Sequence, residues 1–557
     1  MFSTKVFIGF IALATGLPAL AQEAGFIWDK LETSTELNWT ECYTQPLQCA
    51  RFQVPLNYSD PEGASVSIAM IRVPSPLAGT EQYMGPILLN PGGPGSSGIE
   101  LLAEAGAVFS QILGPTFDIV SFDPRGVGFS TPRASFFPTE AQRQFFVSPS
   151  FDDVNALSHG VARVWARAQI LGALASQQDQ KDHLFEHLNT ENTARDMLRM
   201  IEAHGQEKLQ YWGLSYGTVL GATFASLFPD RVERLILDGV VDSEQYFAAR
   251  WSDTLDTDKT LQTFFDSCFE GGPDLCPFYE SSAQAIARKL DELTRTIALR
   301  PVPVITNTSY GLVDYARLRV TIFNSLYAPY GEFPRLAQGL ADLVRGNGTA
   351  LYQMLDTPLF DCNCGTPVPL PAITDAIFAI RCTDGQEVRD TVDESEDYVR
   401  HLLRLSQWGE LLATARVSCA AWPRQEKKHF RGPFVGNTSH PILWIGNTAD
   451  PVTPIASAHK MARGYPGSVV LTQDSPGHSS LAAPSICTVQ RIQSYLLNGT
   501  LPAEGVVCPV TRPIFSVPQP SNNTRSTRDL AVGQEADQDI IEALERLRQT
   551  FRLRSPF

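Results

Sequence analysis

Residues 211–221, YWGLSYGTVLG, place a serine between two glycines at the point where an apolar run gives way to a helical pattern. The apolar run before Ser215 is typical of a buried strand, and the small and apolar residues after it are typical of a buried helix. At such a strand-to-helix turn the hydroxyl is lifted away from the sheet, and flanking glycines let the two elements pack closely. The stretch predicts Ser215 as a nucleophile, with a plain tight turn as the alternative.

Outward from Ser215, strand-like and helix-like segments alternate along the chain. Upstream, GPILLNPGGPG and FDIVSFDPRGVGFS each join an apolar strand to a glycine-containing turn, and downstream VERLILDG and HPILWIGNTADP repeat the pattern. Such alternation predicts an α/β fold, with a mostly parallel sheet flanked by helices and ligands at the carboxyl ends of the strands. Before this alternation, ARFQVPLNY and SVSIAMIRVPS predict a β-hairpin.

The composition divides the chain into five segments. We expect a signal peptide, an α/β core in two parts, an inserted and mainly helical cap domain, and a polar tail that ends in a helix. In chain order, the segments are residues 1–21 (signal peptide), 22–242 (core), 243–433 (cap), 434–510 (core) and 511–557 (tail). The cap is inferred because the strand–helix alternation breaks there. The terminal helix, near residues 537–552, is rich in charge, which favours a solvated helix.

A serine hydroxyl is a weak nucleophile and needs a base that is itself oriented by an acid. Asp450 follows the strand PILWIGNT, and His478 lies in a glycine-containing loop after the strand SVVLTQ. One helix and one strand fit between them, so both side chains are expected at the same sheet edge as Ser215. The sequence therefore predicts a catalytic triad of Ser215, Asp450 and His478.

Other acids and histidines compete for these roles. Asp238 ends the strand RLIL and is the alternative acid, and Asp474 also lies near the histidine loop. His440 begins a strand and His459 falls in a predicted helix, so neither ends a strand in a glycine-containing loop as His478 does. The sequence therefore favours Asp450 as the acid and His478 as the base.

A tetrahedral oxyanion has to be met by preorganised donors, usually the N–H after the nucleophile and one N–H from the loop after an earlier strand. Tyr216 supplies the first donor. Gly93 or Gly92 supplies the second, because glycine lets the main chain approach a substrate carbonyl. Asp123 and Arg125, in the turn DPRGVGFS, are interpreted as an ion pair that supports this turn, without a catalytic role.

The N-terminus indicates export. Residues 1–21 combine one lysine, an apolar stretch and the cleavage motif Ala19-Leu20-Ala21. A retained membrane anchor is the disfavoured alternative, because the stretch is short and no later apolar run is long enough for stable insertion. Asn-x-Ser/Thr sequons agree with a secreted, extracellular glycoprotein, and they lie at Asn38, Asn57, Asn307, Asn347, Asn437, Asn498 and Asn522.

The ten cysteines all follow the signal peptide and suit disulfide bonds in an oxidising compartment. Sequence proximity suggests three pairs, Cys42 with Cys49, Cys268 with Cys276, and Cys487 with Cys508. Two further bonds would be shared among Cys362, Cys364, Cys382 and Cys419. A metal at Cys362 and Cys364 is the weaker reading, because no histidines stand at ligand spacing.

The composition is that of a globular protein, with 557 residues, 43% hydrophobic and 19% charged. The net charge of −16 argues against a nucleic-acid partner and leaves a peptide or a small acyl compound as the expected substrate. Neither a metal nor an organic cofactor is signalled. Nothing in the chain indicates an oligomeric state.

The chain resembles secreted α/β-hydrolase serine peptidases, namely the proline iminopeptidases and, more closely, the tripeptidyl aminopeptidases with a TAP-like C-terminal segment. The resemblance spans residues 35–510 and is weakest in the cap. It rests on the motifs LNPGGPGSSG, FDPRGVGFS, WGLSYGTVLGATFASLFPDRVERLILDGVVD, WIGNTADPVTP, GHSS and PSICTVQRIQSYLLNGTLPAEGVVCP. It implies the α/β-hydrolase fold and an aminopeptidase in which Ser215 attacks a peptide carbonyl, His478 moves the proton and Asp450 orients His478.

The resemblance also implies that cap carboxylates capture the substrate ammonium, for which Asp384, Glu332 and Asp361 are candidates. Proline iminopeptidases usually carry a histidine where this chain has Pro91, so the resemblance leaves the preferred length and sequence of the peptide open.

Two other functions fit the same residues. A carboxylesterase, or a hydrolase that tailors a secondary metabolite, would use the same triad, since a triad does not select amides over esters. A non-catalytic binding protein on the same scaffold is disfavoured, because all three triad residues are present.

Overall fold

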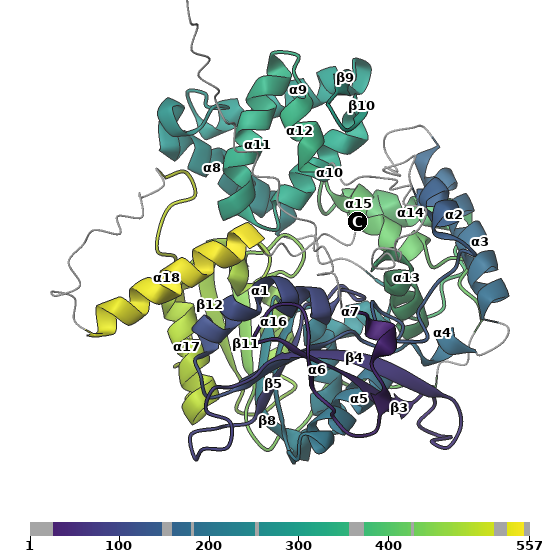
Figure 1. Cartoon of the computed structure of the whole chain (residues 1–557). Coiled ribbons are helices and arrows are strands. Elements are labelled where there is room, and N and C mark those ends of the chain that lie inside the picture. Colours follow the sequence, from purple (N-terminus) through teal and green to yellow (C-terminus); the bar gives the residue numbers. More distant parts are fainter. Residues whose placement is uncertain are drawn as a thin grey trace, which may run out of the picture.

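The structure is a computed structural model that describes residues 26–147, 159–179, 183–250, 256–355, 373–424, 428–516 and 532–550. An α/β core lies beneath a helical cap, and the C-terminal helix crosses one side of the core (Figure 1). The predicted signal peptide lies outside the described residues.

A mixed sheet of eleven described strands forms the centre of the core, in the order β1-β3-β4-β6-β5-β7-β8-β11-β12-β13, with β2 paired to β3. All neighbours from β6 to β13 are parallel, whereas β3–β4 and β4–β6 are antiparallel. The predicted mostly parallel sheet and the hairpin that precedes it are therefore confirmed. The strands are β1 (Thr33–Ser34), β2 (Thr40–Glu41), β3 (Gln48–Pro55), β4 (Ser65–Val73), β5 (Pro86–Asn90), β6 (Asp118–Phe122), β7 (Leu209–Leu214), β8 (Val232–Asp238), β11 (Leu443–Ala449), β12 (Val469–Pro476) and β13 (Val507–Pro509).

Helices cover the faces of this sheet. The central strands β5, β6 and β7 are buried at every residue, as expected of parallel strands packed between helices. The helices of the core are α1 (Gly98–Leu113), α4 (Leu184–His187), α5 (Thr190–Ala203), α6 (Tyr216–Leu227), α7 (Ser243–Phe247), α16 (Ile455–Ala462) and α17 (Ile486–Asn498). Side chains from both faces form two large apolar clusters, one on each side of the sheet.

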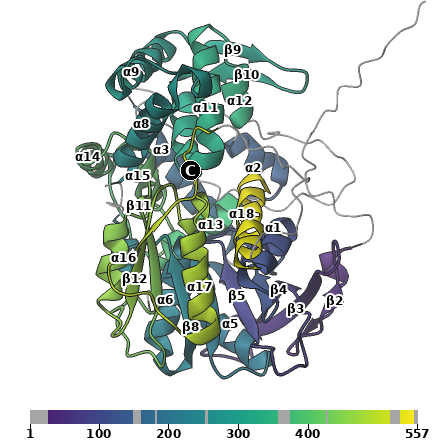
Figure 2. The same cartoon turned by 90° about the vertical axis from the view of Figure 1, so that its left-hand side faces the viewer.

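The insertion forms two parts. The upper part has an apolar cluster of its own and lies above the core in both views (Figures 1 and 2). It comprises α8 (Thr257–Leu275), α9 (Ala283–Leu299), β9 (Val302–Ile305), β10 (Tyr310–Val313), α10 (Tyr315–Ser325), α11 (Pro329–Val344) and α12 (Thr349–Met354). The second part comprises α13 (Ile373–Asp384), α14 (Val392–Leu403) and α15 (Gly409–Val417), and it lies beside α2 (Glu140–Val147) and α3 (Gly160–Gln178). Helix α13 shares the apolar cluster of the core rather than that of the upper part.

The terminal helix α18 (Val532–Thr550) packs on the core, so the prediction of a solvated helix is wrong. Ile540, Ala543, Leu544 and Leu547 are buried in the apolar cluster that contains α1. Their spacing of three and four residues puts them on one helix face, and Arg512 pairs with Glu545 at 2.7 Å beside it. Among the charged residues of this helix, Asp539, Glu542 and Arg546 are exposed.

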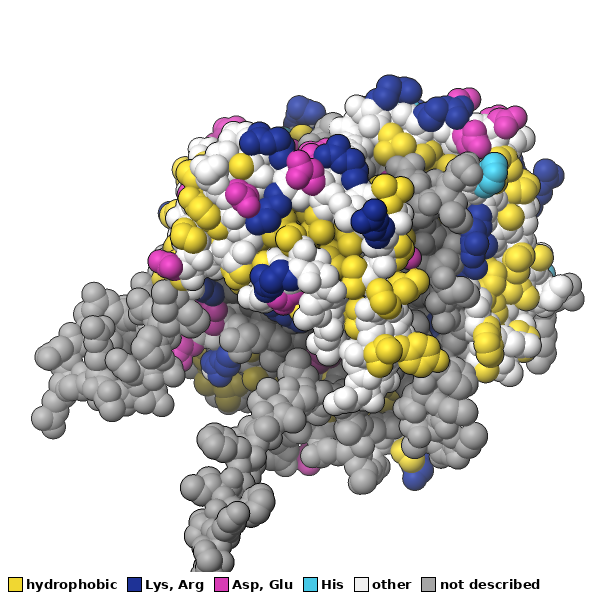
Figure 3. Space-filling view, turned by 90° about the horizontal axis from the view of Figure 1, so that it is seen from above, with side chains coloured by type: hydrophobic (Ala, Val, Ile, Leu, Met, Phe, Trp, Pro, Cys, Tyr) yellow, Lys and Arg dark blue, Asp and Glu magenta, His cyan; other side chains and the backbone are white. Residues whose placement is uncertain are grey.

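The upper surface of the cap carries basic and acidic side chains mixed with hydrophobic ones (Figure 3). The most exposed of the large apolar residues belong to α9 and the β9–β10 hairpin, namely Leu299, Ile305 and Tyr310. Among the described residues, no helix has the length and apolar character needed to cross a membrane.

The packing of α18 is tested by Leu544→Ala. Leu544 is 3% exposed, and removing a buried leucine side chain costs about 2–5 kcal/mol of unfolding free energy. Urea denaturation measures the change, with Gln538→Ala on the exposed face as the control, expected within about 0.5 kcal/mol of wild type. Equal stabilities for all three proteins would contradict the docked position of the helix.

Candidate active site

Ser215 stands at a strained turn between β7 and α6. Its backbone has φ 57° and ψ −122°, a conformation that non-glycine residues rarely adopt. A Cβ on Gly213 would lie 2.4 Å from the carbonyl oxygen of Gly217, so the turn closes only because this position lacks a side chain. The neighbours of Ser215 are buried, whereas Ser215 itself is partly exposed, as the predicted strand-to-helix turn requires.

His478 lies in the loop after β12 with its Nδ1 against an acid. The Nδ1 atom is 3.1 and 3.0 Å from the two carboxylate oxygens of Asp450, so in the tautomer protonated at Nδ1 it donates to that carboxylate. The hydroxyl of Thr453 is also 3.0 Å from Nδ1. On the cap side, the Tyr327 carbonyl accepts the His478 N–H, and the two rings meet edge to face at 5.2 Å. The imidazole is therefore fixed in orientation from both the core and the cap.

Asp450 is fully buried and remains ionised. Burial alone would raise the pKa of its carboxyl, but the His478 charge, the His478 hydrogen bond and further donors outweigh burial and lower the pKa below 3.8. Those donors include the N–H groups of Val452 and Thr453, at 3.0 and 2.9 Å, and the N–H of Ser479, at 2.9 Å. A charged acid of this kind can stabilise an imidazolium beside it.

The alternative acid, Asp238, contacts different groups. Its carboxylate accepts hydrogen bonds from the Ser480 N–H at 2.8 Å, the Ser480 hydroxyl at 2.5 Å and the Trp212 indole at 3.3 Å. Burial raises the pKa of Asp238 to about 6, against these hydrogen bonds and the nearby His478 charge. In the geometry, Asp450 and not Asp238 lies against Nδ1 of His478.

Asp238 also joins the two loops of the site. Its main-chain carbonyl accepts the Ser215 N–H at 2.9 Å, while its carboxylate holds Ser480, two residues after the histidine. Next to it, a Cβ on Gly239 would lie 3.2 Å from the Cβ of Ser479. Ser215 and His478 consequently project from the same edge of the sheet, as the sequence predicts.

The remaining rivals lie away from this arrangement. Asp474 is exposed and accepts a hydrogen bond from the Thr448 hydroxyl at 3.0 Å. His440 precedes β11 and contacts the Val232 carbonyl at 3.1 Å, at the opposite end of the strands. His459 is exposed on α16.

The glycine-rich loop after β5 lies directly against the serine turn. A Cβ on Gly92 would lie 2.9 Å from the Cβ of Ser215 and 3.1 Å from the Tyr216 nitrogen, so only glycine permits this approach. The Gly92 N–H, however, already donates to the Asn90 side chain at 3.0 Å. Of the two predicted glycine donors, Gly92 thus has its N–H engaged within the loop, and Gly93 stays a prediction.

The expected ion pair between Asp123 and Arg125 is not formed. Arg125 is fully buried and makes a two-point contact with Asp196 at 2.8 and 2.5 Å. Asp123 instead accepts hydrogen bonds from the Ser97 hydroxyl, at 2.6 Å, and from the Ile99 N–H, at 3.2 Å. Burial raises the pKa of Asp123 to about 6 despite these bonds. The carboxylate therefore secures the end of the glycine-rich loop, where α1 begins.

The three candidates for ammonium capture differ in access. The carboxylate of Asp384 is completely buried and accepts hydrogen bonds from both Thr190 groups and from the Tyr246 hydroxyl, which contradicts a role in binding substrate. Glu332 lies in the first turn of α11 with 11% of its side chain exposed, and it pairs with Arg335 at 3.0 Å. Asp361 lies outside the described residues.

The cysteines follow the predicted pairing where they are described. Disulfides join Cys42 to Cys49, Cys268 to Cys276 and Cys487 to Cys508, which confirms the three predicted pairs. A fourth bond joins Cys382 to Cys419, two of the four cysteines whose pairing the sequence left open, while Cys362 and Cys364 lie outside the described residues. In the described part of the chain, no group of three His, Cys, Asp or Glu residues is arranged to hold a metal ion.

Five of the seven sequon asparagines are exposed. Those described as exposed are Asn38, Asn307, Asn347, Asn437 and Asn498. Asn57 is half-buried, and Asn522 lies outside the described residues. Access for glycosylation therefore exists at the exposed positions.

Two families match this chain. Residues 85–270, which contain the serine turn, match the family described as alpha/beta hydrolase fold, and residues 405–508, which contain Asp450 and His478, match the family described as TAP-like protein. This chain is a serine hydrolase of the α/β-hydrolase fold. The mostly parallel sheet with flanking helices agrees with this assignment, and the resemblance stated from the motifs is confirmed.

Named relatives match this α/β-hydrolase over most of its length. The serine protease Hip1 of Mycobacterium tuberculosis is 28% identical over 90% of this chain and 95% of its own. The tripeptidyl aminopeptidase of Streptomyces lividans is 27% identical over 85% of this chain and 86% of its own. Carboxylesterase B of Mycobacterium tuberculosis is 29% identical over 83% of this chain and 86% of its own.

The raised pKa of Asp238 predicts a pH-dependent stability. A carboxyl with a pKa of about 6 in the folded state, above its unfolded value, favours folding most at low pH, and that contribution is lost as the pH rises from about 4 to about 6. Asp238→Asn removes this titration, so the unfolding free energy of the variant relative to wild type should rise across that window and level off above it.

Urea denaturation at several pH values measures the difference, with the exposed Asp474→Asn as the control, expected to run parallel to wild type. A constant offset between Asp238→Asn and wild type from pH 4 to pH 7 would contradict the raised pKa.

Proposed function

We propose that this protein is an exported serine aminopeptidase that releases short units, from one residue to a tripeptide, from the free N-terminus of peptides. The observation that carries the proposal is the pairing of His478 Nδ1 with the buried, ionised Asp450 at the sheet edge where Ser215 emerges. The names of two relatives, a serine protease and a tripeptidyl aminopeptidase, support peptides as substrates. The disulfides support an oxidising compartment, in agreement with the predicted signal peptide.

In the proposed mechanism, the Ser215 hydroxyl oxygen attacks the carbonyl carbon while Nε2 of His478 accepts its proton. Asp450 holds the imidazole in the required tautomer and stabilises the imidazolium that forms. The carbonyl oxygen becomes an oxyanion, which the N–H groups of Tyr216 and Gly93 stabilise. His478 then donates the proton to the leaving amine. In the second half, His478 accepts a proton from water as the water oxygen attacks the acyl carbon, and it returns that proton to the Ser215 oxygen as the acid product leaves.

Of the two described candidates for holding the substrate ammonium, Glu332 is the one whose side chain is partly exposed. Glu332 is in the first turn of α11, five residues after Tyr327, and Tyr327 contacts the ring and N–H of His478. A Cβ on Gly477 would lie 2.7 Å from Pro329, so the start of α11 is packed against the histidine loop. We infer that the Glu332 carboxylate binds the substrate N-terminus from the cap side and limits how much peptide enters.

An esterase is the second candidate function. The same triad and donors hydrolyse esters, and one relative is named carboxylesterase B. An esterase would not need a free substrate amine, so blocking that amine separates the two functions.

Substrate class is tested with a peptide library in free and N-acetylated forms, analysed by mass spectrometry. Wild type should release one to three residues from free N-termini only, and Ser215→Ala should release nothing. Glu332→Gln should raise KM for free peptides by about 10-fold or more, because an ammonium loses its charged partner, and should leave aryl-ester hydrolysis unchanged. Cleavage of acetylated peptides at the same rate, or of esters alone, would overturn the aminopeptidase.

The assignment of the acid is tested by comparing Asp450→Asn with Asp238→Asn. Asp450→Asn should lower kcat by about 10⁴-fold, since an amide no longer fixes the imidazole tautomer. Asp238→Asn should retain far more activity, because its carboxylate contacts Ser480 rather than the imidazole. Steady-state kinetics on one substrate measures both, and a larger loss in Asp238→Asn would reverse the assignment.

A further inference from the structure

A chain of buried hydrogen bonds connects the residue after the nucleophile with the cap. The Tyr216 hydroxyl lies 2.6 Å from the Thr190 hydroxyl, which donates to a carboxylate oxygen of Asp384 at 2.6 Å. That oxygen, Oδ2, also accepts the Tyr246 hydroxyl at 2.9 Å. The second carboxylate oxygen, Oδ1, accepts the Thr190 N–H at 2.8 Å. Thr190 and Asp384 are fully buried, and Tyr216 and Tyr246 nearly so.

The chain of bonds spans elements that are far apart in sequence. Thr190 is the first residue of α5 and Tyr216 is the first residue of α6, whereas Asp384 is the last residue of α13 in the insertion. The rings of Tyr216 and Tyr246 pack at 5.6 Å on the same cluster. The Tyr216 ring is therefore connected, through Thr190, to a side chain that the insertion supplies.

The other end of α13 lies against the glycine-rich loop. A Cβ on Gly95 would lie 3.0 Å from the main-chain nitrogen of Ile377 and 3.2 Å from the Cβ of Ala376. Gly95 is two residues from Gly93, the second proposed oxyanion donor. One helix of the insertion thus contacts the neighbourhood of both donors, one at each end.

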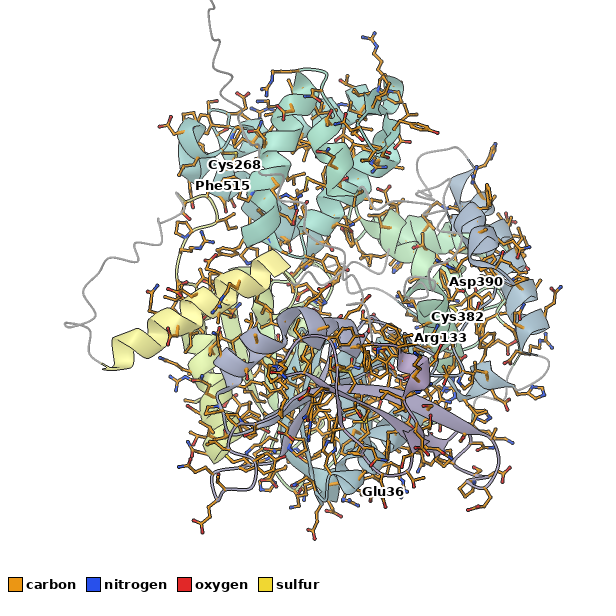
Figure 4. The ribbon with its side chains drawn as sticks, in the orientation of Figure 1. Glu36, Arg133, Cys268, Cys382, Asp390 and Phe515 are labelled. Carbon is orange, nitrogen blue, oxygen red and sulfur yellow. A yellow bond between two sulfur atoms is a disulfide. The ribbon has the colours of Figure 1, made fainter. Side chains whose placement is uncertain are left out.

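Helix α13 is itself fixed in place. The disulfide Cys382–Cys419 ties its last turn to the segment after α15, and the Thr383 hydroxyl donates to the Phe185 carbonyl at 3.0 Å. Cys382 is labelled in Figure 4, on the side of the molecule where α13 meets the core. From the neighbouring loop, His429 lies 3.1 Å from the Asp384 carbonyl oxygen. A rigid helix end is what a positioning function requires.

We propose that Asp384 is a positioning residue which, through Thr190, fixes the Tyr216 main-chain N–H, so that α13 sets the geometry of the oxyanion site from the insertion. Oxyanion stabilisation depends on donors that are placed before the reaction, and a displacement of about 1 Å can lower the rate about 100-fold. The inference rests on the proposed role of Tyr216 as a donor, and it assigns the buried carboxylate a function other than ammonium capture.

The test uses Thr190→Val, which keeps the side-chain shape and removes the hydroxyl between Tyr216 and Asp384, with Thr190→Ser as the variant that retains the hydroxyl. Thr190→Val should lower kcat and the rate of Ser215 labelling by a fluorophosphonate by about 10- to 100-fold, with KM within about 3-fold of wild type. Thr190→Ser should restore both rates to within about 3-fold. The labelling rate is informative because the phosphoryl oxygen occupies the same donor site.

Asp390→Asn controls for general loosening of the insertion. Asp390 lies six residues after Asp384 and pairs with Arg416 at 2.7 Å. Among the described residues it has no contact with Thr190 or Tyr216. It should lower the melting temperature and leave both rates near wild type. If Thr190→Val does not fold, Tyr216→Phe replaces it, since that change removes only the ring hydroxyl.

Three results would overturn the proposal: wild-type rates in folded Thr190→Val, a raised KM with unchanged kcat, or an equal loss of rate in Asp390→Asn. These results differ from failure of the proposed function. If wild type labels at Ser215 but cleaves no peptide, the aminopeptidase is wrong, and the labelling rates still test Asp384.

Discussion

The hydrogen bonds at the carboxyl end of β8 hold the candidate site together. The main chain of Asp238 accepts the N–H of Ser215, and its side chain accepts two hydrogen bonds from Ser480. Since β8 is a central strand of the sheet, the serine turn and the histidine loop are both hydrogen-bonded to the same rigid element. The strain stored at Ser215 is tolerable only because its surroundings fix it in this way.

Four buried carboxylates illustrate how partners decide the role of an acid. Asp450 faces an imidazole and several N–H donors, so its pKa is lowered and it stays charged. Asp123, Asp238 and Asp384 are equally buried but have raised pKa values, because hydrogen bonds offset only part of the penalty of burial. These three hold, respectively, the glycine-rich loop, the histidine loop and the start of α5. One acid thus serves the imidazole, and the others serve the backbone around it.

The insertion participates in the site rather than only covering it. Tyr327 packs on His478 from above, and α13 reaches into the apolar cluster of the core beside Tyr216. The break in the strand–helix alternation predicted an inserted domain, but it did not indicate that the helices of the insertion form two parts. The sequence also misplaced the terminal helix, since charge on one helix face says nothing about what covers the other.

Local patterns predicted the core strands β3–β8, β11 and β12, the serine turn and the order Ser215, Asp450, His478, because alternation, glycine positions and strand ends are properties of short segments. They also determined three disulfides, each between cysteines close in sequence. Only the tertiary structure decided that Asp450 faces His478 and that Arg125 pairs with Asp196. It also decided that the Gly92 N–H donates to Asn90 and that the Asp384 carboxylate is buried away from substrate. Each of these depends on which side chains meet across separate elements, and the spacing of residues along a chain does not contain that information.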